Sequence, residues 1–184
     1  NITAIQIQSQ LVKRAGDTPL AIEAAGQIND LARRIHRSTR QLLRQLRPPV
    51  LDELSLQEAL HHLVNEFAFA ERGIRCRFDY RLPTPPESET LVFTLYRLLQ
   101  ELLNNVCKHA NASEVTILLC QRHARLHLEV RDNGSGISPQ QQPGFGIQGM
   151  RERVSALGGE LTLESHAGTR VIVNLPTNLQ QTHL

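Results

Sequence analysis

The sequence predicts an α+β fold in two parts: a helical segment over residues 1–47, and an α/β sandwich over residues 48–184. Apolar residues spaced three and four apart indicate helices, and alternating apolar and polar residues indicate strands. In the second part these two patterns segregate, which predicts one layer of helices on a mixed β-sheet.

The helical segment predicts two amphipathic helices separated by a turn at Gly16-Asp-Thr-Pro19. In the second helix, Ile28, Ile35 and Leu42 are spaced by seven residues, which is typical of a coiled-coil or bundle seam. Two helices of this kind cannot bury a core alone. We therefore expect a homodimer through residues 1–47, in which two copies form a four-helix bundle.

A proline pair marks the boundary between the two parts. Arg47-Pro48-Pro49 ends the second helix, because proline excludes helix at the residue before it and cannot donate a backbone hydrogen bond. Ser55-Leu-Gln-Glu58 has the form of a capping box, and we expect it to open a helix that runs to about Glu71 and ends at Gly73. Residues 75–82 alternate charged and apolar side chains, which predicts a half-exposed strand.

The same two periodicities predict the remaining elements of the sandwich. Leucines at helical spacing give the next long helix one apolar face, and clusters of glycine and proline separate the later segments. The expected elements are a helix over about 87–109, strands over 115–120 and 125–131, a helix over about 146–157, and strands over 160–164 and 169–175.

Composition limits the classes of function. The net charge is +2, so no overall field favours nucleic acid or an anionic membrane. No apolar run approaches the roughly 20 residues that span a bilayer. Three cysteines without CxxC spacing indicate free thiols in a reducing cytosol. Because the single methionine is Met150 and the chain begins at Asn1, we expect a piece of a longer protein.

Three short segments in the second half carry the candidate chemistry, and the first is Glu101-Leu-Leu-Asn-Asn105-Val-Cys-Lys108-His109-Ala. Glu101 and Asn105 are four residues apart on the expected helix, so they project from one face. Their oxygens are hard ligands of the kind that Mg²⁺ prefers. Lys108 is placed to reach a phosphate as a point charge. Taken alone, this segment also fits a solvated polar face.

The other two segments are rich in glycine. Asp132 enters Asn-Gly134-Ser-Gly136-Ile137, where a carboxylate is placed to accept a hydrogen bond from an exocyclic amine, and glycines allow a flat ligand to approach the backbone. Gly144-Phe-Gly146-Ile147-Gln-Gly149 leads into a helix, whose free N–H groups favour an anion. The loop between them is a candidate lid. Taken alone, Asp-Asn-Gly also fits an ordinary turn.

In this order, the three segments resemble the N, G1 and G2 boxes of the Bergerat-type ATPase fold shared by histidine kinases, type II topoisomerases, Hsp90 chaperones and MutL. Residues 144–159 and 47–60 further resemble the histidine kinases of the nitrate/nitrite-sensor branch. The resemblance covers nearly the whole chain. It implies a two-component sensor histidine kinase that binds Mg-ATP, phosphorylates a histidine, and passes the phosphoryl group to an aspartate of a response regulator receiver domain that controls transcription.

The resemblance also implies roles for single residues. In the family, the aspartate matching Asp132 binds the adenine amine, and the threonine matching Thr169 lies near the adenine. The asparagine matching Asn105 holds Mg²⁺, and the glutamate matching Glu101 acts as a base or positions water. The residues implied for ATP binding are Asn105, Lys108, His109, Asp132, Gly134, Gly136, Ile137, Gly144, Gly146, Ile147, Gly149, Met150 and Thr169.

One departure from the family concerns the phosphoacceptor. Its Glu-Leu-His-Asp type motif does not occur here, and by register it belongs just upstream of Asn1. His36 is an expected helical residue but is followed by Arg37 and lacks an acidic neighbour, so we expect no phosphoacceptor in this chain. A basic run on the second helix fits either a solvated bundle face or a docking site for an acidic response regulator, and DNA binding is less favoured. The run consists of Arg33, Arg34, Arg37, Arg40, Arg44 and Arg47.

Two alternatives to a kinase stay open. One is a non-catalytic dimeric regulator of the same fold, against which the intact Glu101, Asn105 and Asp132 argue. The other is a different ATPase of this fold, such as an anti-sigma serine kinase or a MutL-like clamp, against which the preceding pair of helices argues.

Overall fold

The computed structural model describes residue 28 and residues 48–137 and 145–178. The chain divides into two units, Asn1–Pro48 and Pro49–Leu184. The expected helix pair, its dimer seam, His36 and the arginine run lie outside the described residues, apart from Ile28, which is helical. The expected lid loop and Gly144 also lie outside them.

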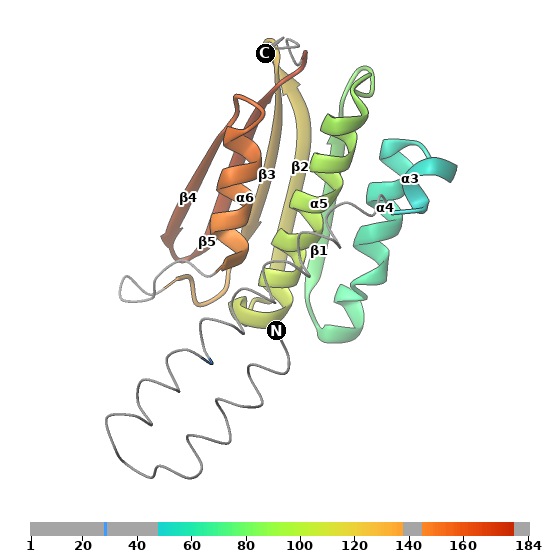
Figure 1. Ribbon diagram of the computed structural model, residues 1–184. Helices are drawn as coiled ribbons and strands as arrows, with labels where there is room; N and C mark the ends of the chain where they lie inside the picture. Colours follow the sequence, from blue (N-terminus) through green and yellow to red (C-terminus); the bar gives the residue numbers. More distant parts are fainter. Residues whose placement is uncertain (1–27, 29–47, 138–144, 179–184) are drawn as a thin grey trace. The chain divides into compact units, whose positions relative to one another are not determined.

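The second unit is built on a five-stranded sheet with the strand order β1-β2-β3-β5-β4 (Figure 1). β1 runs parallel to β2, and the other neighbouring pairs are antiparallel. The helices α4, α5 and α6 cover one face of this sheet, which confirms the predicted single helical layer on a mixed sheet (Figure 1). The elements are α3 (Val50–Glu53), α4 (Leu56–Glu66), a 3₁₀ turn (Phe69–Arg72), β1 (Arg75–Arg81), α5 (Glu89–Asn105), a π-turn (Val106–Ala110), β2 (Glu114–Arg122), β3 (Arg125–Asp132), α6 (Phe145–Ser155), β4 (Glu160–His166) and β5 (Gly168–Pro176).

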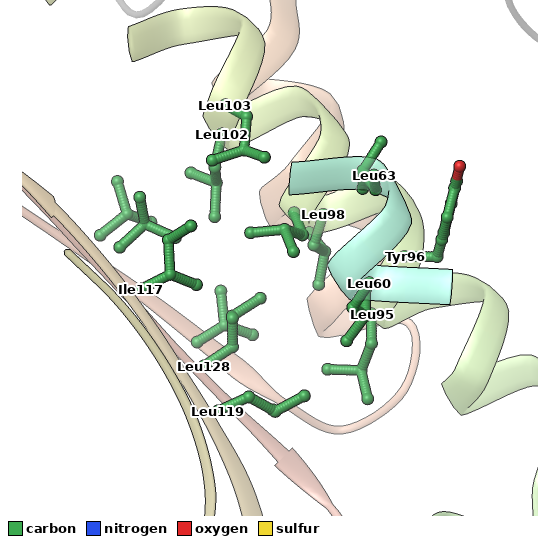
Figure 2. Close-up of a cluster of buried hydrophobic side chains, with 14 of the residues drawn as sticks. Leu60, Leu63, Leu95, Tyr96, Leu98, Leu102, Leu103, Ile117, Leu119 and Leu128 are labelled. Atoms are coloured by element: carbon green, nitrogen blue, oxygen red, sulfur yellow. The ribbon is translucent and has the colours of Figure 1, made fainter. Parts of the chain in front are cut away.

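The hydrophobic core lies between α5 and the sheet. Figure 2 shows Leu95, Leu98 and Leu102 of α5 on the side of the helix that faces Ile117 and Leu128 of the strands. All five side chains are at most 3% exposed. Burying one such side chain contributes about 1.5–3 kcal/mol to the free energy of unfolding, so the contact of helix on sheet is the main source of stability.

The predicted capping box at the start of α4 is confirmed. The Ser55 hydroxyl accepts the Glu58 N–H, and the Glu58 carboxylate accepts the Ser55 N–H at 3.0 Å. Two donors of the first helical turn are thereby satisfied, a contribution of about 1 kcal/mol.

The helix that begins at this capping box ends earlier than predicted, at Glu66 instead of Glu71. Ala68 adopts a left-handed conformation with φ of 45°, and a 3₁₀ turn follows. The break directs Phe69 into the core, where it is 4% exposed. Phe69 follows Leu63 by six residues, which corresponds to about 600° of helical rotation, or about 240° beyond one full turn. In a continued helix, Phe69 would therefore point away from the apolar face that carries Leu63.

The next helix also differs from the prediction at its end. α5 stops at Asn105, and the chain continues as the π-turn as far as Ala110. This wider turn keeps Val106 and Ala110 buried and leaves Lys108 and His109 exposed. None of the helices within residues 48–137 and 145–178 is both long and apolar enough to cross a membrane.

An arginine on β5 ties three strands together on the sheet face opposite the core. Arg170 donates to both carboxylate oxygens of Glu129 on β3, at 2.8 and 3.1 Å, and to Glu164 on β4 at 3.1 Å. The neighbouring Arg170 guanidinium holds the pKa of Glu129 below its usual value of 4.5, against the opposing effect of partial burial. This carboxylate is therefore a source of pH-dependent stability.

We predict that the free energy of unfolding of Glu129→Gln depends less on pH in the acidic range than that of wild type. The contribution of Glu129 is complete above its unfolded-state pKa near 4.5 and is lost as the pH falls through its lower folded-state pKa. Glutamine does not titrate, so urea unfolding followed by circular dichroism should show a smaller loss between neutral pH and about pH 3. Glu164→Gln, with one bond to Arg170, is the control and should resemble wild type. An unchanged pH profile for Glu129→Gln would contradict this role.

Candidate functional site

A buried carboxylate lies at the end of the core-facing side of the sheet. Asp132 is the last residue of β3, two positions after the buried Val130, and is 6% exposed. Its Oδ1 accepts the N–H of Gly134 at 2.9 Å and the N–H of Thr169 at 3.2 Å. Among the described residues, no hydrogen bond reaches Oδ2. As far as the described residues go, the second oxygen of this buried carboxylate is therefore free to accept a ligand N–H.

The residue after this aspartate anchors the glycine-rich loop Asp132–Ile137, called the G1 loop below. The Asn133 Oδ1 accepts the N–H groups of Ser113 and Glu114 at 2.9 and 2.8 Å. Its Nδ2 donates to the Ser113 hydroxyl at 2.9 Å. The loop is thus tied to the start of β2, beyond what an ordinary Asp-Asn-Gly turn requires.

The middle of the G1 loop packs against the π-turn at the end of α5. A Cβ atom added to Gly134 would lie 2.0 Å from the Ala110 carbonyl oxygen, so a side chain cannot be accommodated there without moving the backbone. Ser135 donates its N–H to the same oxygen at 2.7 Å, and its hydroxyl lies 3.4 Å from the His109 carbonyl oxygen. The N and G1 segments are therefore adjacent, as expected from the sequence.

The N segment also meets the start of α6. A Cβ atom added to Gly146 would lie 2.2 Å from Oε1 of Glu101, so this carboxylate packs directly on the first turn of α6. Asn105, one helical turn after Glu101, is half-buried at the end of α5. The start of a helix favours negative charge, which suits both a carboxylate and a phosphate.

The β4–β5 hairpin closes the other side of the G1 loop. Gly168, with φ of 99°, packs so closely that an added Cβ would lie 2.0 Å from the Asp132 carbonyl oxygen. The Ser165 hydroxyl accepts the Ile137 N–H at 2.6 Å. Sequence reasoning named neither Gly168 nor Ser165. Gly168 directly before Thr169 was a turn signal that could have been used, whereas no local pattern marks Ser165.

The structure thus brings together two groups of predicted residues. Asp132 bonds directly to Gly134 and Thr169, and Glu101 contacts Gly146. Three other predicted residues lie in α6: Ile147 is half-buried, and Gly149 and Met150 are buried, with Met150 in the core at 1% exposure. Gly136 and Ile137 are half-buried in the G1 loop.

The kinds of metal-binding side chain near the site limit which metal ion it suits. Within the described part of the chain, no group of three or more His, Cys, Asp and Glu side chains is placed to hold a metal ion. This arrangement does not suit a structural zinc site. It is compatible with Mg²⁺, which typically takes one or two protein oxygens and completes its shell with water and substrate phosphates.

Two family profiles match this chain. Residues 91–179 match the family described as "Histidine kinase-, DNA gyrase B-, and HSP90-like ATPase", and residues 1–51 match a family described as "Histidine kinase".

Curated relatives agree with these profiles. The signal transduction histidine-protein kinase/phosphatase UhpB of Salmonella typhimurium is 45% identical over 177 residues, which is 95% of this chain and 35% of the relative. The kinase/phosphatase DegS of Brevibacillus brevis is 30% identical over 184 residues, which is 96% of this chain and 47% of the relative. The chain therefore spans less than half the length of these curated relatives.

Solved histidine kinase structures share the fold. The histidine kinase domain of the blue-light activated histidine kinase of Erythrobacter litoralis has a TM-score of 0.58 at 18% identity, covering 96% of this chain and 95% of that one. The histidine kinase AdeS of Acinetobacter baumannii has a TM-score of 0.59 at 16% identity, with the same coverage of 96% and 95%. The two matched profiles and the 45% identity to a member extend this likeness from the fold to the family. This chain belongs to the two-component sensor histidine kinases, of which it carries the dimerisation and ATPase regions.

Proposed function

We propose that this chain binds Mg-ATP and transfers the γ-phosphoryl group to a histidine, from which an aspartate of a response regulator receives it. The observation that carries the proposal is the buried Asp132 carboxylate. Two backbone N–H groups bond to its Oδ1, and among the described residues none bonds to its Oδ2. Adenine offers an exocyclic amine, the kind of donor that this oxygen lacks. Gly134 and Gly168 let neighbouring backbone pack closely beside this carboxylate, which holds it in place.

The phosphate end of the nucleotide is assigned to the region around Glu101, Asn105 and the first turn of α6. The α6 N-terminus attracts negative charge, and the exposed Lys108 supplies a mobile positive one. Bound Mg²⁺ would neutralise phosphate charge and orient the γ-phosphoryl group. The half-buried Asn105 amide is the protein oxygen that we assign to the ion.

The transfer itself needs little covalent chemistry from the protein. A neutral imidazole nitrogen attacks the γ-phosphorus, the bond to the β–γ bridging oxygen breaks, and ADP leaves with that electron pair. The imidazole loses its N–H proton, and Glu101 is the carboxylate in this region that we assign to accept it or to hold a water that does. The protein contributes mainly positioning and charge stabilisation.

The setting of this reaction follows the family. We propose that residues 1–47 pair two copies into a four-helix bundle, and that a receiver domain docks there to collect the phosphoryl group. The matched histidine kinase profile over residues 1–51 supports the pairing. ATP is a cytoplasmic substrate, so this part would face the cytoplasm, and the parent protein would be anchored in the inner membrane.

A phosphotransfer assay in trans tests the proposal. No Glu-Leu-His-Asp motif occurs within the 184 residues, so the acceptor is supplied as a separate dimerisation-domain fragment that carries it. With γ-labelled Mg-ATP, we expect acid-labile label on the added fragment and none on this chain. Label on this chain would contradict the absence of an acceptor and direct attention to His36. No label on either partner, with ATP binding intact, would favour a non-catalytic regulator and contradict the kinase assignment.

For Asp132→Asn we predict a loss of ATP affinity of roughly tenfold to a hundredfold. The asparagine carbonyl would take over the two backbone N–H bonds, and its NH₂ group would then meet the adenine amine as donor against donor. Titration calorimetry measures the change. Asp79→Asn, on β1 in an ion pair with Arg81, is the matched control and should bind ATP like wild type. Wild-type affinity in Asp132→Asn would reject this residue as the reader of the base.

For Asn105→Ala we predict that ATP binding loses most of its dependence on Mg²⁺, because the proposed protein ligand of the ion is gone. The measurement compares ATP affinity in Mg²⁺ with that in EDTA for each variant. Asn104→Ala changes the preceding half-buried asparagine, which points about 100° around the helix, and should keep the wild-type response. An equal Mg²⁺ response in Asn105→Ala and wild type would contradict the assignment.

A further inference from the structure

The hydroxyl of Ser165 holds the far end of the G1 loop through its backbone. Its Oγ accepts the N–H of Ile137 at 2.6 Å and lies 3.4 Å from the carbonyl oxygen of the same residue, to which it is placed to donate. Both residues are half-buried, and they are 28 positions apart in the sequence. One side chain on β4 therefore fixes both polar backbone groups of one loop residue.

The glycine before this residue allows the contact. Gly136 has φ of 72°, and an added Cβ there would lie 2.7 Å from the Ser165 hydroxyl oxygen. A side chain at position 136 would thus be strained by its backbone conformation and would also press on the hydroxyl. The close approach therefore depends on glycine at position 136 of the loop and on serine at position 165 of β4.

The same hairpin also holds the other end of the G1 loop. Ser165 is paired with Thr169 across the β4–β5 ladder, and the Thr169 N–H donates to Asp132 Oδ1 at 3.2 Å. Gly168, between them, packs on the Asp132 carbonyl. The G1 loop is therefore held at its first residue by Thr169 and Gly168, and at its last by Ser165. The hairpin therefore contacts both ends of the loop whose first residue is Asp132.

We propose that Ser165 is a positioning residue for nucleotide binding: its hydroxyl sets the path of the G1 loop beside the Asp132 carboxylate. This inference rests on the proposed function, because the loop is taken to line the adenine. It concerns binding more than folding, since the core of the domain lies between α5 and the sheet and does not involve the serine hydroxyl. Without the hydroxyl, the Ile137 N–H loses its partner and the loop gains freedom that ATP must then remove.

The test compares two β-branched replacements in the full chain. Ser165→Thr keeps the hydroxyl, and Ser165→Val replaces it by a methyl group of similar size, while both suit a strand. We expect Ser165→Thr to bind ATP within about twofold of wild type and Ser165→Val to bind roughly five- to tenfold more weakly. Titration calorimetry gives the affinities, and circular dichroism with urea unfolding establishes that each variant is folded.

The control is Thr162→Ala, which removes a half-buried hydroxyl from the same strand but from the opposite face, three positions away. It should bind ATP like wild type. Equal ATP affinity of the Thr and Val variants would overturn the role of Ser165 and leave the proposed function standing. Failure of the wild-type chain to bind ATP would overturn the proposed function and this inference with it.

Discussion

The site depends on the need to satisfy a charged group inside the domain. An ionised carboxylate that is nearly excluded from water costs several kcal/mol unless hydrogen bonds compensate it. Asp132 receives two backbone N–H groups at one oxygen, and both come from segments outside its own strand, at Gly134 and Thr169. Satisfying the charge therefore fixes the G1 loop and the β4–β5 hairpin against β3. The same arrangement leaves the other Asp132 oxygen without a hydrogen bond among the described residues.

Close contacts around the site require glycine where a side chain would collide with a neighbouring group. At Gly134, Gly146 and Gly168, an added Cβ would approach within 2.2 Å of Ala110, Glu101 and Asp132, respectively. Each contact joins two segments that lie far apart in the sequence. The glycines act here less as flexible hinges than as positions where one backbone packs directly on a neighbouring group. At Gly134 and Gly168 the neighbouring group is backbone, so these two contacts require glycine, whereas at Gly146 the neighbour is the end of the flexible Glu101 side chain.

The sequence predicts those features that depend on local pattern. The leucine spacing of α5, the capping box at Ser55 and the alternation in the strands predict the elements correctly, because each pattern is read within a few residues. The early end of α4 was missed, since the left-handed Ala68 results from the burial of Phe69 in the tertiary core. The short α3 carried too little pattern to detect. In the candidate site, the motifs indicate Asp132 and Glu101, whose roles stay predictions. The hydrogen bond between Ser165 and Ile137 joins residues 28 positions apart and has no local signature in the sequence.

The central claim is that the free oxygen of a buried Asp132 carboxylate selects adenine, and the most direct test is the affinity of the wild-type chain for ATP against GTP. Guanine presents a carbonyl oxygen where adenine presents its amine, so it would place acceptor against acceptor at Asp132 Oδ2. We predict that ATP binds at least roughly tenfold more tightly than GTP in titration calorimetry under identical Mg²⁺ conditions. Equal affinity for the two nucleotides would contradict the claim.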